Sequence, residues 1–189
     1  MNKMLFLNIG WMKNYRGLED DCIAGGGEFV QQFNDGSEPD NYPPCEIRNF
    51  EPHEGYMYGF VRVKKDGSIR IERLGASRKD KSTGNVLVIW VAKSRSNGTV
   101  IVGWFRNATV YRDCQLPPEE SGRKRPGRQE WGYRVKAKEE NCKLLPVEHR
   151  IIRVPRGRGG MGQSNVWYAD QPENDAFRQE VWEFITQIN

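Results

Sequence analysis

β-branched and aromatic residues form the longest apolar segments of the chain. NVLVIWVAK (85–93) and TVIVGWFRNATVYRD (99–113) have this composition, which is typical of strands buried in a sheet. An Asn97-Gly98 pair lies between them, and both residue types adopt the positive φ angles that a tight turn needs. The sequence therefore predicts a long β-hairpin, and MLFLNIGWM (4–12) predicts a further buried strand.

Two further strand pairs follow from shorter apolar segments. YMYGFVRVKKDGSIRIERL (56–74) predicts a hairpin that turns at its Asp-Gly pair. Its second arm alternates isoleucine with charged residues, which is typical of a strand with one face in solvent. WGYRVKAKE (131–139) and HRIIRVPR (149–156) predict the third pair.

One segment near the C-terminus has the apolar spacing of a helix. We expect it to begin near Pro172, with Asp170 or Gln171 as the N-cap and acidic residues in its first turn. Its apolar positions are Phe177, Val181, Phe184, Ile185 and Ile188. The pattern is still in register at residue 188, so we expect more protein to follow residue 189 in the natural chain.

Two long segments separate these elements and predict loops or arms. Residues 31–55 and 113–130 are rich in proline, glycine and polar residues, and long loops of this kind usually have a function. Together the elements predict a mainly β (α+β) fold in one domain spanning residues 1–189. We expect a curled or barrel-like, largely antiparallel sheet with protruding arms and a C-terminal helix.

The composition is that of a globular protein. The chain is 37% hydrophobic and 29% charged, and no apolar run approaches the roughly 18 residues that a membrane span needs. Its four cysteines include no Cys-x-x-Cys pair and it has two histidines, which argues against a zinc finger or ribbon. We therefore expect a cytoplasmic protein with reduced thiols and no membrane partner.

The charges are distributed unevenly although the net charge is only +4. Residues 1–61 carry 4 basic and 10 acidic side chains, and residues 161–189 carry 1 and 5. Residues 62–120 carry 12 and 6, and residues 121–160 carry 12 and 4. A basic centre between acidic ends indicates a polyanionic partner on one face, and the alternative is a set of basic loops that keep the protein soluble.

Two short segments concentrate the basic residues. GRKRPGR (122–128) and HRIIRVPRGRG (149–159) can contact phosphates, and the glycines of the second permit a close backbone approach. The amides of the following GQSN can bond to adenine edges. The candidate DNA-binding residues are Arg123, Lys124, Arg125, Arg128, Arg150, Arg153, Arg156, Arg158, Gln163 and Asn165. The same residues also fit an ordinary solvated loop.

Acidic residues cluster around a glycine triplet in the first third of the chain. Asp20, Asp21, Glu28 and Glu46 are the candidate catalytic residues. Asp21, Glu28 and Glu46 are the candidate ligands of Mg²⁺ or another divalent cation, which would activate water for phosphodiester cleavage. Scattered surface acids are the alternative. No Asp or Glu is followed two positions later by Lys, and neither His begins a His-x-Lys motif, so two common nuclease patterns are absent.

Five segments resemble the BisI-type modification-dependent restriction endonucleases: GGGEFV, EIRNF, IVGWFRNATVYRD, KLLPVEHRIIRVPR and GQSNVWYAD. The resemblance implies cleavage of double-stranded DNA at GCNGC-like sites that carry several 5-methylcytosines, without base flipping. It also implies arms that embrace the DNA and an Arg-apolar pair that reads it. Both Arg153-Val154 and Arg150-Ile151 fit that pair. Arginine would bind guanine and the apolar side chain would contact a cytosine methyl. We expect a homodimer, because such sites are nearly palindromic.

A second resemblance leads to a different function. VLVIWVAKSRSNGTVIVGWFRNATVYRD and YRVKAKEENCKLLPVEHRI resemble strand pairs of PUA-like and EVE barrels. This resemblance implies a non-catalytic reader of modified DNA or RNA that flips a base into an aromatic cage. Tryptophans and tyrosines occur throughout the predicted strands, and most of them are expected in the core. A module that binds RNA is a third alternative.

Overall fold

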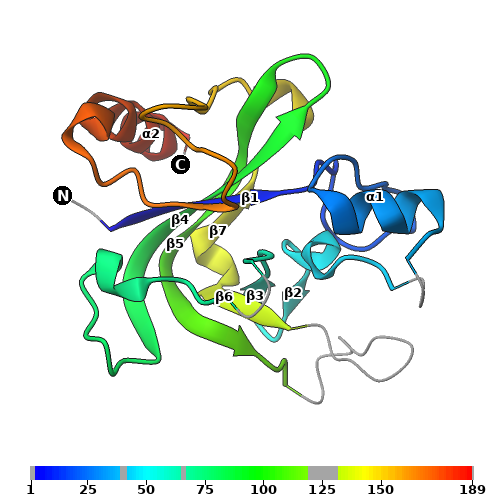
Figure 1. Cartoon of the computed structure of the whole chain (residues 1–189), viewed down its shortest axis with the longest axis horizontal. Coiled ribbons are helices and arrows are strands. Elements are labelled where there is room, and N and C mark those ends of the chain that lie inside the picture. The colour runs from blue at the N-terminus through cyan, green and yellow to red at the C-terminus, as the bar shows by residue number, and fades with distance from the viewer. Residues whose placement is uncertain (1–2, 39–41, 65–66, 119–131, 189) are drawn as a thin grey trace.

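The structure is a computed structural model that describes residues 3–38, 42–64, 67–118 and 132–188. The protein is mainly β: of the described residues, 35% are in strands and 23% in helices, and the strands form one largely antiparallel sheet that is not closed (Figure 1). The strands are β1 (Met4–Ile9), β2 (Pro52–His53), β3 (Tyr56–Gly59), β4 (Ser82–Ser94), β5 (Gly98–Gln115), β6 (Tyr133–Lys138), β7 (Cys142–Leu144) and β8 (Val166–Trp167). The sheet is therefore open rather than a barrel, and the predicted fold class is confirmed.

The sheet is organised around the hairpin of β4 and β5. Its strand order is β2-β3-β6-β5-β4-β1-β8, and β7 also pairs with β5. β1 runs parallel to β4, whereas the other pairs are antiparallel. The hairpin turns over residues 95–97, and Gly98 begins β5 with a φ of +72°. The turn predicted at Asn97-Gly98 is thus confirmed.

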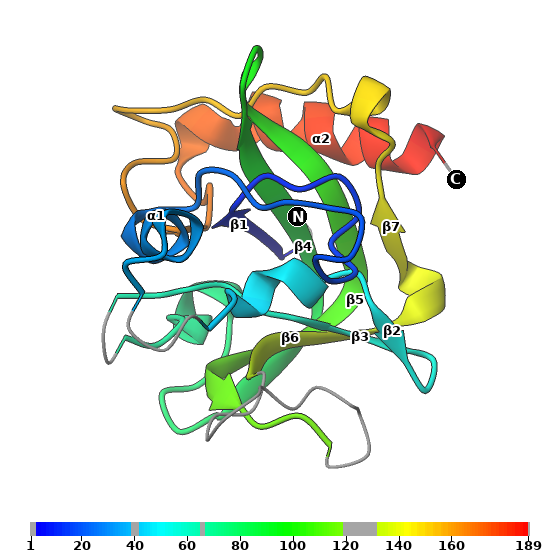
Figure 2. The same ribbon diagram turned by 90° about the vertical axis from the view of Figure 1, so that its right-hand side faces the viewer.

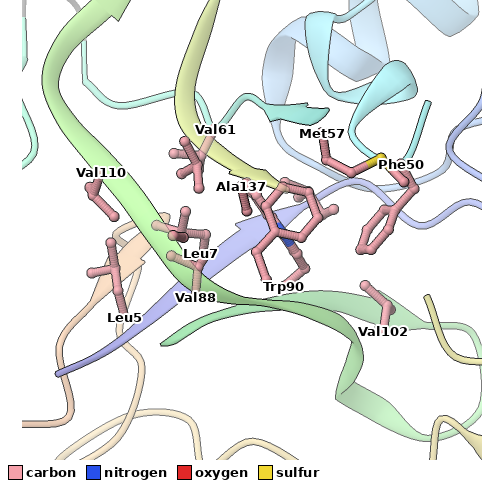
Figure 3. Packing of buried hydrophobic residues seen from close by; sticks show 14 of the residues in the cluster. Leu5, Leu7, Phe50, Met57, Val61, Val88, Trp90, Val102, Val110 and Ala137 are labelled. Atoms are coloured by element: carbon pink, nitrogen blue, oxygen red, sulfur yellow. The ribbon is translucent and has the colours of Figure 1, made fainter. Parts of the chain in front are cut away.

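Both faces of the central strands are buried, which explains their continuous apolar sequences. Leu5 and Leu7 of β1 and Trp90 of β4 point into one core, which Figure 3 shows. The intervening residues, such as Phe6 of β1 and Ile89 of β4, belong to a second core on the opposite face. Alternate side chains of a strand point to opposite faces, so covering both faces requires apolar residues at every position.

Two α-helices flank the sheet. α2 (Asp175–Gln187) packs against the second core through buried Val181 and Ile185, and Figures 1 and 2 show it along one face. It follows a 3-10 turn that begins at Pro172, which confirms the predicted C-terminal helix. α1 (Glu28–Asp35) was not predicted. No helix among the described residues is long and apolar enough to cross a membrane.

Short 3-10 helices occupy several of the connections. They are η1 (Cys45–Arg48), η2 (Ile71–Leu74), η4 (Glu139–Asn141), η5 (Val147–His149) and η6 (Pro172–Asn174).

Two of the predicted strand pairs are wrong. β3 pairs with β2 and β6, and the second arm predicted in 56–74 is instead an extended segment that leads into η2. The arm's isoleucines are nevertheless buried, as their alternation predicted. β6 pairs with β3 and β5, whereas residues 149–156 contact β5 through a single isolated bridge. Alternation identified the buried isoleucines of 56–74 but not the partner strand. In 149–156 it identified neither, because Arg150 is buried and Ile151 is exposed.

Candidate functional site

A cleft of about 770 Å³ lies between the start of α1 and two segments distant in sequence. One wall contains the glycine loop and α1, at Gly26–Phe29 and Gln32. The second wall consists of Arg62–Lys64, Gly67, Ser68, Arg70 and Arg73, and the third consists of Gln163–Val166 with Tyr168. The position of α1 beside the sheet can be followed in Figure 2. The sheet therefore brings together three segments that the sequence keeps far apart.

The lining of the cleft is strongly basic. Among the described residues, four cations, Arg62, Lys64, Arg70 and Arg73, line it with one carboxylate, that of Glu28. Among the described residues, the first three cations have no carboxylate within ion-pair distance, and all three are exposed. Positive charge in a concave site attracts anions more strongly than the same charge on a flat surface.

The fourth cation, Arg73, is held by the protein itself. Its guanidinium makes a two-point ion pair with Asp170, with one contact of 2.8 Å between Nε and Oδ2. The same guanidinium lies 4.1 Å from the centroid of the Tyr168 ring. Arg73 therefore supports the wall of the cleft, and its charge is largely compensated.

Hydrogen bonds fix the walls to one another. The backbone N–H of Arg70 donates to the Tyr168 hydroxyl at 2.7 Å, and burial raises the pKa of that hydroxyl. Asn165 donates its amide to the carbonyl of Arg62 at 2.9 Å and accepts from the Asn8 amide at 3.1 Å. Both ends of the Asn165 side chain are thus engaged within the protein. The cleft is preformed, which reduces the entropy lost when a ligand binds.

An aromatic side chain on α1 also faces a cation of the cleft. The guanidinium of Arg62 lies 4.7 Å from the centroid of the Phe29 ring, which itself lines the cleft. Cation–π contacts at exposed sites contribute only about 0.5–1 kcal/mol. Arg62 is therefore oriented by Phe29 without being neutralised, and it stays available to an anion.

Glu46 is buried behind the glycine loop. Its carboxylate accepts the backbone N–H of Gly10 at 2.6 Å, and only 4% of the residue is exposed. Burial raises its pKa to about 7, although the bond from Gly10 and the charge of Arg62 act in the opposite direction. A Cβ at Gly26 would lie 3.1 Å from this carboxylate and 3.0 Å from the Gly10 Cα. The glycine loop therefore passes directly over Glu46, and the sequence needs glycine there.

The four candidate catalytic carboxylates have different environments. Asp21 accepts backbone N–H groups from Lys13, Asn14, Tyr15 and Cys22, so it holds the loop after β1 in shape. Asp20 is exposed and lines a separate pocket together with Asp21. Glu28 lines the basic cleft, and Glu46 lies behind it. No three His, Cys, Asp or Glu side chains in the described ranges are grouped to hold a metal, so the predicted Asp21, Glu28 and Glu46 trio is not brought together.

Arg150 is a structural residue and not a base reader. Its guanidinium donates to the carbonyls of Leu145 at 3.0 Å, Met12 at 2.6 Å and Lys13 at 2.7 Å. It is 1% exposed and stacks over Trp11, with 4.9 Å to the ring centroid. The prediction that Arg150-Ile151 reads the methylated base is therefore wrong, because the buried arginine cannot reach a DNA groove.

Arg153-Val154 also cannot read the base as a pair, because here the apolar residue is buried and not the arginine. Arg153 is exposed, but Val154 is 4% exposed and belongs to the core beneath α2. Its backbone N–H donates to the carbonyl of Thr99 at 2.8 Å, which fixes the valine inward. A buried side chain cannot contact a base. The prediction that Arg153 and Val154 together read the methylated base is therefore also wrong.

The other predicted DNA-binding residues divide between two places. Gln163 and Asn165 line the cleft. Arg156 and Arg158 are exposed on the segment beside the β4–β5 hairpin. The four basic residues of the other predicted arm, Arg123, Lys124, Arg125 and Arg128, lie outside the described residues.

Sequence reasoning missed the cations of the second wall. All four cations belong to the segment 56–74 that was predicted as a hairpin, and only Arg70 and Arg73, in its second arm, were attributed to a solvent face. Arg62, Lys64 and Arg70 alternate with valine and isoleucine, which was a signal that these three cations lie on the side opposite the core. Arg73 does not follow this alternation, because it lies in η2. What that side faces depends on contacts with α1 and residues 163–168, which the local sequence does not contain.

Comparison with known proteins adds no relative. No protein-family model, curated protein or solved structure matches the chain.

Proposed function

We propose that the protein binds double-stranded DNA in the basic cleft and cleaves it when it carries 5-methylcytosine. The observation that supports binding is the set of three cations, Arg62, Lys64 and Arg70, that line one preformed cleft without an ion pair to any described residue. Phosphate contacts supply most of the affinity of DNA-binding proteins. Cleavage and methyl dependence rest on the resemblance to BisI-type endonucleases, and with them the homodimer that a nearly palindromic site favours.

Two of the predicted catalytic residues are compatible with a reaction in this cleft. Glu28 is the one carboxylate among the described residues that line the cleft, and Mg²⁺ commonly binds one or two protein carboxylates together with substrate phosphates. A DNA phosphate held by the cations could therefore complete a cation site around Glu28. Glu46 has a pKa of about 7 and lies behind the same wall, which suits a group that takes up and releases a proton near neutral pH.

A non-catalytic reader of modified bases is the second candidate. The cleft contains two aromatic side chains, Phe29 and Tyr168, and amides on the segment that begins at Gln163. A flipped base is held by stacking on such rings and by hydrogen bonds to its edge. In this alternative the protein binds modified DNA or RNA in the same cleft and does not cut it.

One assay distinguishes the two candidates. The protein is incubated with methylated and unmethylated GCNGC duplexes, and with single-stranded RNA, in the presence and absence of Mg²⁺. Mg²⁺-dependent cutting of the methylated duplex, lost in Glu28→Gln with binding retained, is the result expected of the nuclease. Selective binding without cutting under any divalent cation supports the reader and overturns the nuclease.

A further inference from the structure

A second cationic surface lies at the tip of the β4–β5 hairpin. Lys93 and Arg95 are exposed there, and Arg153, Arg156 and Arg158 are exposed on the neighbouring segment. Neither residues 93–99 nor residues 151–167 contain an Asp or Glu. In Figures 1 and 2 the hairpin tip projects from the body of the protein, with this segment running beside it.

Backbone hydrogen bonds attach the segment to the hairpin. The N–H of Ile101 donates to the carbonyl of Ile152 at 3.0 Å, and the N–H of Val154 donates to Thr99 at 2.8 Å. Thr99 is in turn the partner of Lys93 across the hairpin. The cations of the two elements are therefore carried on segments that an isolated backbone bridge joins, and not on independent arms.

The two outer arginines are presented by a tight loop. The N–H of Met161 donates to the carbonyl of Pro155 at 2.8 Å, and the N–H of Gly160 donates to Gly157 at 3.1 Å. Gly157 has a φ of +86°, a conformation that residues with a side chain rarely adopt. The loop places Arg156 and Arg158 on either side of this glycine without burying either side chain.

These cations lack acidic partners. Within the described ranges, none of the five side chains forms an ion pair or a hydrogen bond. The carboxylate of Glu173, in η6, lies beside the loop, since its Oε1 would be 4.0 Å from a Cβ at Gly159. A set of like charges held together without counter-charges is unfavourable unless a polyanion binds to it.

We propose that this hairpin surface, defined by Lys93, Arg95, Arg153, Arg156 and Arg158, binds the sugar–phosphate backbone of DNA that also occupies the cleft. The inference rests on the proposed DNA binding. The segment that carries the three arginines continues through Gln163 and Asn165 into the wall of the cleft. One duplex can therefore contact both surfaces, with the hairpin contributing affinity that does not depend on base sequence.

The test compares charge-matched double variants by fluorescence anisotropy on duplexes of different sequence over a range of salt. Lys93→Gln with Arg95→Gln, and Arg156→Gln with Arg158→Gln, each remove two charges from the hairpin surface. Lys138→Gln with Lys143→Gln removes two charges from β6 and β7, and neither lysine lines the cleft or belongs to the hairpin surface. The melting temperature of each variant shows whether it is folded.

We expect each hairpin variant to bind more weakly and to reduce the log–log salt slope by about 1 to 2, with equal effects on all sequences. The control keeps the wild-type slope, and Glu173→Gln binds more tightly. Hairpin variants with wild-type affinity and slope overturn this inference while leaving binding in the cleft intact. A wild-type protein that binds no duplex overturns the proposed function as well.

Discussion

Arg150 and Arg153 are three positions apart and have opposite environments. Arg150 is buried with three carbonyl partners, whereas Arg153 is exposed and unpaired within the described part of the chain. An arginine-rich sequence indicates a nucleic-acid contact only where the charge remains accessible. At this scale burial decides the role, because a guanidinium that satisfies buried carbonyls stabilises the fold and contributes nothing to an interface.

The first prediction concerns the stability of these two sites. Arg150→Gln removes charge-assisted hydrogen bonds to three carbonyls, two of which belong to the loop after β1. We expect it to lower the free energy of unfolding by about 3 kcal/mol or more. Arg153→Gln, at an exposed position, should change it by no more than about 0.5 kcal/mol. Urea unfolding of both variants measures the difference, and equal stabilities would contradict the assignment of Arg150.

Glu46 gives the second prediction, a pH dependence of stability. Burial raises its pKa in the folded protein from 4.5 to about 7, so the folded state retains a proton that the unfolded chain has already released. Stability contributed by this group therefore falls as the pH rises from about 4.5 to about 7, by up to about 3 kcal/mol, and stays low above that.

Glu46→Gln removes this titration and keeps an acceptor for the Gly10 N–H. We expect the variant to be more stable than the wild type at pH 8 and nearly equal to it at pH 4.5. Urea unfolding across this pH range gives the comparison. A wild type and variant that differ by the same amount at every pH would show that Glu46 does not titrate in this window.

The elements that the sequence predicts best are those whose contacts are local. The β4–β5 hairpin combines β-branched strands with a turn that needs positive φ, and its partners are adjacent in the chain. The segments 56–74 and 149–156 have strand-like alternation, but their partners are far away. Ile69, for example, donates its N–H to Arg112 of β5. Tertiary contacts therefore override local periodicity in both segments.

The glycine loop before α1 supplies a prediction at the scale of the element. A Cβ at Gly26 would lie 2.9 Å from Val30 and 3.0 Å from the Gly10 backbone, whereas a Cβ at Gly27 meets nothing within 4 Å. Both have positive φ. We expect Gly26→Ala to destabilise the protein by about 1–3 kcal/mol more than Gly27→Ala. Both substitutions strain the backbone at positive φ, but only the Cβ at position 26 overlaps neighbouring atoms. Thermal unfolding of the pair is the measurement, and similar losses would argue against a close passage over Glu46.

The cleft could be predicted only in part, because segments that are far apart in the sequence form it together. Glu28, Gln163 and Asn165 were identified from local chemistry and do line one cleft. Arg62 and Arg70, which carry its charge, were not identified. The cleft depends on β1 lying beside both β4 and β8, and this brings residues 163–168 next to α1. No local pattern contains that arrangement.

Binding of DNA in the cleft is the central claim, and one titration tests it most directly. A methylated GCNGC duplex is titrated into three proteins at salt concentrations between about 50 and 200 mM, where phosphate contacts dominate affinity. The proteins are the wild type, the cleft variant Arg62→Gln with Arg70→Gln, and the control Lys138→Gln with Lys143→Gln. We expect the cleft variant to lose at least about tenfold in affinity and about 1 to 2 in salt slope, while the control keeps wild-type values. Equal binding by all three folded proteins would contradict the claim.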